Sequence, residues 1–117
     1  MLAKSARLTE SADFARTTKS GLRFSTQNFV GYLYPTTLNQ PARAGLIISK
    51  SIGGSVTRHR IARKVRHTLR EMYPQLPTGG LLVVRALNNA HDADVAQEIT
   101  KIVGQLLKKL SEKANQK

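Results

Sequence analysis

The sequence of 117 residues predicts an α/β sandwich: a single mixed sheet of about four strands with three helices, in the order α-β-β-β-α-β-α. Short runs rich in apolar, aromatic and β-branched residues alternate with longer segments of helical periodicity. In addition, residues 43–87 place an apolar run on each side of a basic amphipathic segment, as a strand, crossover helix, strand unit does. The length fits one domain, residues 1–117, with flexible ends.

The first part of the chain is expected to contain one helix and three strands. A helix is predicted over residues 9–19, because Thr9 or Ser11 can cap its first turn. RFSTQNFVGYLY, residues 23–34, favours strand structure, and its polar STQN interruption leaves open either a bent strand or a hairpin. RAGLIISK, residues 43–50, is typical of a short buried strand.

The second part is expected to contain two long helices around one strand. The basic helix is predicted over residues 57–73 and ends at the prolines and glycines of PQLPTGG. LLVVRAL, residues 81–87, predicts a strand. A final helix is predicted over residues 92–113, with apolar residues at i, i+3, i+4 spacing: Val95, Ile99, Ile102, Val103, Leu106, Leu107 and Leu110.

The charge of the chain is strongly unbalanced. Nineteen Lys and Arg against seven Asp and Glu give a formal charge of +12 and a pI near 10.8. This excess predicts a polyanionic partner, and its arginine-rich form favours nucleic acid over an anionic membrane. The absence of cysteine excludes disulfides and thiolate metal sites. Because the sequence has no signal peptide pattern and no apolar run of about eighteen residues, we expect a cytoplasmic protein that binds no membrane.

The stretch SVTRHRIARKVRHTLRE, residues 55–71, combines a core face with a cationic face. Its apolar positions fall within an arc of about 80° on a helix, so they can pack on the sheet: Ile61, Val65, Leu69 and Met72. Between Arg58 and Arg70 there is no acid, and the first arginines stand where the helix dipole disfavours cations. These features predict that an external anion offsets the charge.

The residues before this helix are also suited to an anion. Gly53 and Gly54 can adopt φ > 0 or let another backbone come close, and free N–H groups follow at the helix start. The spacing GxxxxGK[ST] is missing, which excludes a nucleotide-hydrolysing P-loop. RNA or DNA phosphate is therefore the predicted ligand.

SKSIGGSVTRHRIARKVRHTLRE resembles the signature of the bacterial ribonuclease P protein subunit. RLTESADFARTTKSG resembles the first helix of that family with its Asp-Phe pair, NFVGYLY its aromatic strand and LLVVRA its last strand. The resemblance implies a protein that joins ribonuclease P RNA, a large catalytic RNA, and takes part in removing the 5′ leader of precursor tRNA. It places the catalytic centre in the RNA, with Mg²⁺ acting there together with the substrate, and requires no further protein partner. It also implies a left-handed strand, helix, strand crossover, against a rule obeyed in about 98% of cases.

By position, the resemblance implies two groups of RNA-binding residues. The group facing the catalytic RNA would be Lys50, Arg58, His59, Arg60, Arg63, Lys64 and Arg66. A cleft between the first helix and the sheet would hold the single-stranded leader with Phe14, Thr18 and Tyr32. An aromatic ring in such a cleft can stack on an unpaired base for about 1–3 kcal/mol. Phe14 can equally be a core residue, and either Tyr32 or Leu33 should be buried because side chains alternate along a strand.

Several positions depart from the commonest pattern of the family. His59 stands where Asn is usual, Ser51 and Ala62 stand where Lys is usual, and Thr18 stands where a second cleft aromatic is common. His59 can still donate a hydrogen bond to phosphate.

Other classes of function fit the sequence less well. A metal-free ribonuclease would use His59 and His67 as acid and base, but they lie about 80° apart on one helix with no partner to orient either ring. Asp92, Asp94 and Glu98 could be metal ligands, yet helix capping explains them. We therefore expect neither a catalytic residue nor a protein metal site. A general RNA- or DNA-binding module of ribosomal-protein type is the alternative, although strands, rather than a second helix, flank the basic helix.

Overall fold

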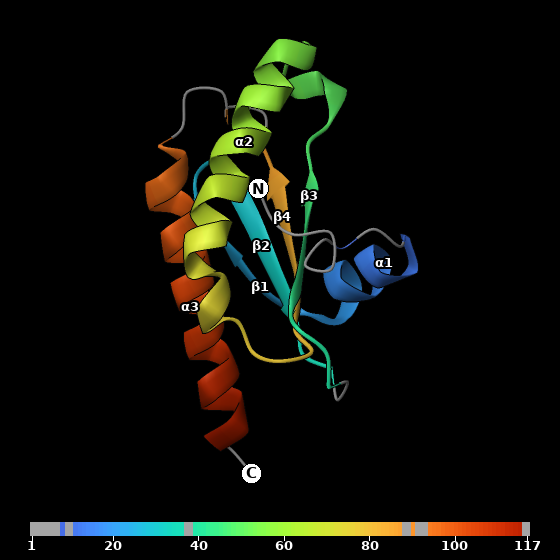
Figure 1. Ribbon diagram of the computed structural model, residues 1–117, viewed down its shortest axis with the longest axis vertical. Helices are drawn as coiled ribbons and strands as arrows, with labels where there is room; N and C mark the ends of the chain where they lie inside the picture. Colours follow the sequence, from blue (N-terminus) through green and yellow to red (C-terminus); the bar gives the residue numbers. More distant parts are fainter. Residues whose placement is uncertain (1–7, 9–10, 37–38, 88–89, 91–93, 116–117) are drawn as a thin grey trace.

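The computed structural model describes residues 8, 11–36, 39–87, 90 and 94–115. It confirms the α/β sandwich with one four-stranded mixed sheet, in the strand order β1-β2-β4-β3, and helices on both of its faces (Figure 1). The elements are α1 Ser11–Ser20, β1 Leu22–Ser25, β2 Phe29–Tyr34, β3 Arg43–Ile47, α2 Ser55–Met72, β4 Leu81–Ala86 and α3 Val95–Asn115. Two 3₁₀ turns, Lys50–Ile52 and Tyr73–Gln75, flank α2.

The order of the elements is as predicted, and their ends differ by a few residues. Ser25 pairs with Val30, so the STQN interruption forms the turn of an antiparallel hairpin rather than a bend in one strand. The last helix begins at Val95, where the Asp94 carboxylate accepts a hydrogen bond from the Gln97 N–H at 3.2 Å. This contact confirms a capping role for Asp94. The predicted helix starts at Thr9 and Asp92 lie outside the described residues.

The connection from β3 through α2 to β4 has an unusual hand. β3 and β4 are parallel neighbours, whereas β2 pairs with β4 antiparallel. In Figure 1 both parallel strands point upward, and α2, which connects them, lies in front of the sheet. The second strand, β4, lies to the left of the first strand, β3. The crossover is therefore left-handed, as the family resemblance implied and as general rules would not have predicted.

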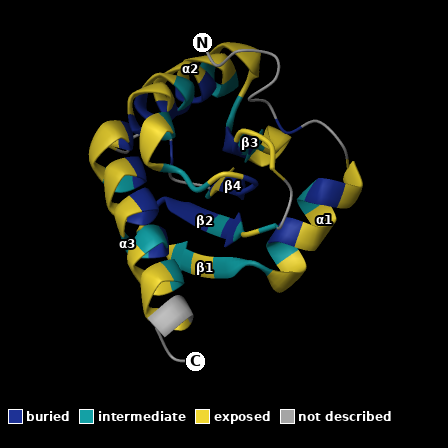
Figure 2. Cartoon of the chain, turned by 60° about the horizontal axis from the view of Figure 1, so that its bottom comes forward, coloured by how far each residue is buried: buried dark blue, intermediate teal, exposed yellow. Residues whose placement is uncertain are grey.

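The main core lies between the sheet and the pair α2 and α3, where Figure 2 shows buried residues facing one another. The predicted core face of α2 is buried, and so are Val95, Ile99, Ile102, Val103 and Leu106 of α3. Leu107 and Leu110 of the predicted stripe are partly buried against this core. Gly31 of β2 lets α3 come close, because a Cβ there would lie 2.2 Å from Cγ2 of Ile102. The helical periodicity of the sequence thus identified the helix faces that pack on the sheet.

The opposite face of the sheet is covered by α1 over a smaller apolar cluster. Leu8, Leu81 and Val83 are buried there, with four half-buried side chains packed against them: Phe14, Tyr32, Tyr34 and Ile47. The Asp13 carboxylate, only 7% exposed as a residue, pairs with Arg16 on the same helix and with Arg43 of β3 at 3.4 Å. A buried ion pair therefore helps to fix α1 on the sheet.

The turn between β1 and β2 is held by a carboxylate of α3. Glu98 accepts hydrogen bonds from the Thr26 hydroxyl at 2.6 Å, the Asn28 N–H at 2.9 Å and the Asn28 side-chain amide at 2.8 Å. Burial acts to raise the pKa of Glu98, but the hydrogen bonds from Asn28 and Thr26 outweigh it and hold the pKa below its usual value. The ionised carboxylate is thus part of the folded structure.

Polar groups from elsewhere in the chain reach both outer strands. Lys109 of α3 donates from Nζ to the Arg23 carbonyl of β1 at 2.7 Å. On the other side, the Leu8 N–H donates to the Ala44 carbonyl of β3 at 2.8 Å. No helix in the described part of the chain is long and apolar enough to cross a membrane.

Candidate nucleic-acid interface

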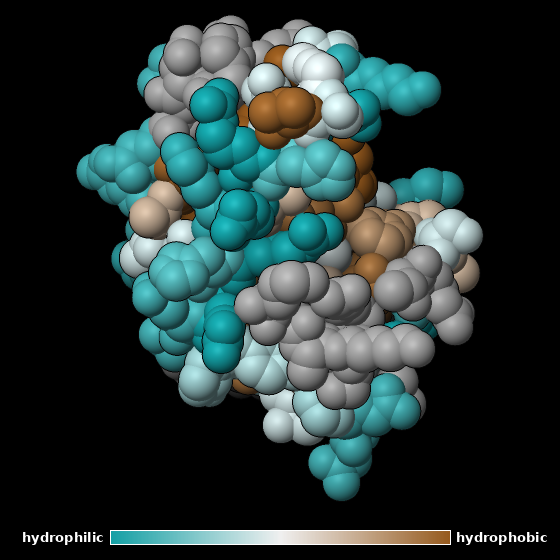
Figure 3. All heavy atoms as spheres, turned by 45° about the horizontal axis from the view of Figure 1, so that its top comes forward, coloured by the Kyte–Doolittle hydropathy of each residue, from teal (hydrophilic) through white to brown (hydrophobic). Residues whose placement is uncertain are grey.

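α2 presents a buried face to the sheet and a cationic face to solvent. The buried positions are Ile61, Ala62, Val65, Thr68, Leu69 and Met72. Exposed cationic or titratable side chains lie on the other side: His59, Arg60, Arg63, Lys64, His67 and Arg70. Arg58 and Arg66 are half-buried at the border between the two faces. Figure 3 shows the hydrophilic surface that gathers over this side of the molecule, so the predicted amphipathic helix is confirmed.

The start of α2 is not neutralised by its own side chains. Gly54 is the N-cap and makes no side-chain hydrogen bond, and the first turn contains no acidic residue. The preceding Gly53 has a φ of 157°, so it adopts one of the positive φ values that glycine permits, whereas Gly54 has a φ of −69°. The positive end of the helix dipole and the arginines that follow it therefore share one surface.

The arginines and the lysine of α2 have no acidic ion-pair partners within the described residues. The ion pair described on this helix joins His67 to Glu71 at 3.5 Å, and both side chains are largely exposed. Arg60, Arg63 and Lys64 have no ion pair in the described part of the chain. A face that served only solubility would gain from mixed charges at i, i+4 spacing, so the arrangement favours an external anion.

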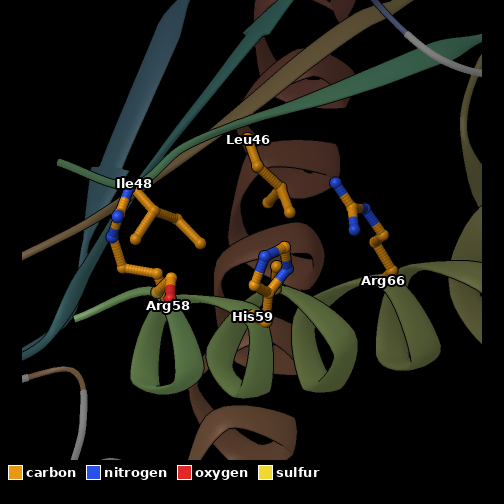
Figure 4. Close-up of a pocket in the computed structure, with 7 residues that line it drawn as sticks. Leu46, Ile48, Arg58, His59 and Arg66 are labelled. Atoms are coloured by element: carbon orange, nitrogen blue, oxygen red, sulfur yellow. The ribbon is translucent and has the colours of Figure 1, made fainter. Parts of the chain in front are cut away.

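A pocket of about 280 Å³ lies between α2 and β3, at the border of the cationic face. Leu46 and Ile48 form its apolar wall, and Figure 4 shows His59 and Arg66 extending from the helix toward Leu46, with Arg58 beside Ile48. Nε of Arg58 is buried and has no hydrogen-bond partner among the described residues. The pocket thus offers guanidinium donors next to an apolar surface, a combination that suits a sugar–phosphate backbone.

The outer side of α2 also combines charge with apolar surface. Val56 is 81% exposed and lines a shallow pocket with His59, Arg60, Arg63 and Lys64. Next to it, Arg63, Lys64 and His67 face the start of α3 across a second pocket, lined also by Asp94 and Val95. Lys50, the remaining predicted residue of this group, is exposed in the 3₁₀ turn before α2. The structure therefore brings the whole predicted group to α2 and the turn before it.

The second predicted group lies on the opposite face of the sheet. Phe14 is half-buried, and its ring covers the backbone of β3, since a Cβ on Gly45 would lie 2.4 Å from Cζ of that ring. Thr18 is also half-buried, and its hydroxyl donates to the Phe14 carbonyl at 3.0 Å. Tyr32 is half-buried on this face, whereas Leu33 is 1% exposed in the main core. The predicted alternation is confirmed, and the aromatic rings of Phe14 and Tyr32 belong to one cluster.

Four arginines on this same side were not assigned by sequence reasoning. Arg16 and Arg43 are held by Asp13, and the Arg16 guanidinium lies 5.5 Å from the centroid of the Tyr34 ring. Arg23 of β1 and Arg85 of β4 are exposed. The sequence contained a signal for Arg85, because a charge interrupts an otherwise apolar strand, but the face it occupies depends on strand register.

Comparison with known proteins gives the same family as the sequence resemblance. The family model for ribonuclease P matches residues 2–111. The chain belongs to the ribonuclease P protein family. The ribonuclease P protein component of Streptomyces avermitilis is 39% identical over 105 residues, covering 83% of this chain and 85% of that protein. That of Mycobacterium sp. (strain KMS) is 36% identical over 99 residues, covering 83% of each.

Solved ribonuclease P proteins share the fold. The Staphylococcus aureus protein superimposes with a TM-score of 0.71 at 27% identity, covering 90% of this chain and 94% of that chain. The Thermotoga maritima protein gives the same TM-score of 0.71 at 22% identity, covering 87% and 96%. The resemblance to this family in the sequence is thereby confirmed.

Proposed function

We propose that this chain is the protein subunit of ribonuclease P, which binds the catalytic RNA and the 5′ leader of precursor tRNA and assists Mg²⁺-dependent removal of the leader. Its membership of the family supports the subunit role. The catalytic centre belongs to the RNA in this proposal, the Mg²⁺ ions act there with the substrate, and no ligand for them is assigned in this chain. The role places the protein in the cytoplasm.

The observation that carries the proposal is the cationic face of α2. Its arginines and lysine project from a helix that is fixed on the sheet by a continuous buried face. Forked guanidinium donors fit phosphate oxygens, and each neutralised phosphate releases counterions into solution. Binding through this face would therefore weaken steeply with salt. We assign it to the ribonuclease P RNA, with Arg60 and Arg63 as central contacts.

The α1 side of the sheet is proposed to bind the leader. Tyr32 offers a half-buried ring there, beside the ring of Phe14. Stacking on such rings tolerates any base, as a subunit that processes many precursor tRNAs would require. Because the sheet separates this surface from α2, one chain can contact the catalytic RNA and the leader at the same time.

Cleavage of a leader-bearing precursor tRNA at low Mg²⁺ tests the proposal. The reaction is run with catalytic RNA alone, with the protein alone, and with both. Efficient cleavage only by the mixture is the expected result. Cleavage by the protein alone would require a catalytic site in the chain, with His59 and His67 as the first residues to replace. A protein that never assists the RNA would favour the alternative, a general RNA- or DNA-binding module.

A further inference from the structure

Tyr32 lies between two arginines on neighbouring strands. Arg23 of β1 is its direct cross-strand partner, so the two side chains share a face. On the other side, Arg85 of β4 pairs with Val30, which stands two residues before Tyr32 on the same face of β2. The order of strands is β1-β2-β4, so the three side chains lie on one face of the sheet in a diagonal row of arginine, tyrosine and arginine. Val83 lies directly opposite Tyr32 on β4, and Arg85 stands two residues further along that strand.

Both arginines are exposed and uncompensated. Arg85 is the one exposed residue of β4, whose other positions are all buried. Among the described residues neither Arg23 nor Arg85 has an ion-pair partner, in contrast to Arg16 and Arg43, which share the Asp13 carboxylate. A central strand has apolar neighbours on both sides, so an unpaired guanidinium there gains little from the fold itself. An outside partner with negative charge would account for it.

The position of this row fits single-stranded nucleic acid. Arg23 and Arg85 are separated by two strand spacings, about 10 Å across the sheet, and by two residues along it, about 7 Å, and a half-buried aromatic ring stands between them. Proteins that bind unpaired strands combine cations along the backbone with rings on which bases stack. A sheet face with an aromatic residue on an inner strand is also how one common RNA-binding fold receives unpaired bases.

We propose that Arg23 and Arg85 bind phosphates of the leader on either side of the base that stacks on Tyr32, so that the leader crosses β1, β2 and β4. This inference rests on the proposed function and extends the leader site from α1 and β2 to β1 and β4. The predicted members of the leader surface, Phe14, Thr18 and Tyr32, carry no charge. Arg23 and Arg85 would add positively charged side chains that can bind phosphate.

The test measures equilibrium binding of precursor and mature tRNA to the reconstituted complex of catalytic RNA and protein. Arg23→Ala, Arg85→Ala and the double variant are compared with Lys101→Ala, which removes one exposed charge from α3. Each arginine variant should weaken precursor binding about two- to fivefold, as loss of an exposed ion pair does, and leave mature tRNA binding unchanged. Each should also reduce the slope of log affinity against log salt by about 0.7, the value for one phosphate of a single strand. Lys101→Ala should change neither quantity.

The outcomes separate the inference from the function on which it rests. If the unmodified protein gives the complex no preference for precursor over mature tRNA, the leader-binding function fails and the inference fails with it. If that preference exists and the arginine variants retain it in full, the function stands and the inference is overturned. Equal losses for both tRNAs would also overturn it, because the arginines would then contact something other than the leader. Circular dichroism of each variant verifies that the fold is intact.

Discussion

Replacement of Glu98 by alanine should lower the stability of the fold without touching either proposed RNA surface. The substitution removes three hydrogen bonds that the carboxylate accepts from Thr26 and Asn28. Asn28 is 9% exposed, so its N–H and its amide would lose partners in a site that water reaches poorly. A buried donor left without a partner costs about 1–3 kcal/mol. Because Glu98 itself is half-buried and water can reach part of the site, we expect a loss of about 2 kcal/mol.

Glu98→Gln removes the negative charge of the side chain but keeps its size and shape. Its amide would keep an acceptor for Thr26 but would set an NH₂ group against the NH₂ of Asn28, and we expect a loss of about 1 kcal/mol at neutral pH. The folded pKa of Glu98 is lowered, so its contribution is complete above the unfolded pKa of about 4.3 and disappears as the pH falls through the folded pKa. The difference between Glu98→Gln and the unmodified chain should therefore be largest at neutral pH and shrink in acid.

Urea unfolding followed by circular dichroism measures both effects. With a denaturant dependence of about 2 kcal/mol per molar urea, Glu98→Ala should lower the midpoint by about 1 M at neutral pH. Glu112→Gln, an exposed carboxylate on the same helix, is the matched control and should not move it. Equal midpoints for Glu98→Ala and the unmodified chain would refute the argument. A Glu98→Gln difference that stayed constant as the pH falls below about 4 would refute its electrostatic part.

Four further variants address the RNA surfaces and the packing. Arg63→Ala should weaken binding of the catalytic RNA and reduce its salt slope by about 0.9; an unchanged slope would exclude a phosphate contact. Tyr32→Ala should weaken binding of precursor tRNA but not of mature tRNA, and equal losses would contradict the leader assignment. Gly31→Ala should destabilise the chain by about 1–3 kcal/mol in urea, because the new Cβ would overlap Ile102; a neutral effect would show that α3 can shift freely. Asp13→Ala should cost about 3 kcal/mol by leaving partly buried Arg43 unpaired, and unaltered thermal unfolding would argue against the ion pair.

The parts of the fold that follow from local pattern were predictable. The apolar spacing in α2 and α3 identified both buried faces, and the STQN interruption indicated either a bend or a hairpin, of which the structure shows the hairpin. The hand of the crossover was not predictable from physical rules, because it contradicts the usual preference and came only from the family resemblance. The burial of Asp13 could not be predicted from the sequence either. Its partner Arg43 is thirty positions away, and the contact forms only when α1 packs on the sheet.

The same distinction holds for the candidate site. The cationic face of α2 was predictable because all its members lie on one helix, where spacing in the sequence fixes direction in space. The row formed by Arg23, Tyr32 and Arg85 was not, because it requires the pairing of three strands and a shift of one residue would turn each side chain to the other face. Sequence reasoning found the tyrosine through the family pattern and missed its two neighbours.

The hydrogen bonds on the two outer strands have a consequence for self-association. An open sheet can grow by pairing its edge with the edge of another copy, which leads to aggregates. Here Lys109 occupies the Arg23 carbonyl of β1, and the Leu8 N–H occupies the Ala44 carbonyl of β3. A second copy would have to displace one of these groups, and bring together two chains of charge +12, before a shared sheet could form. These contacts and the shared positive charge disfavour growth of the sheet by strand addition from a second copy.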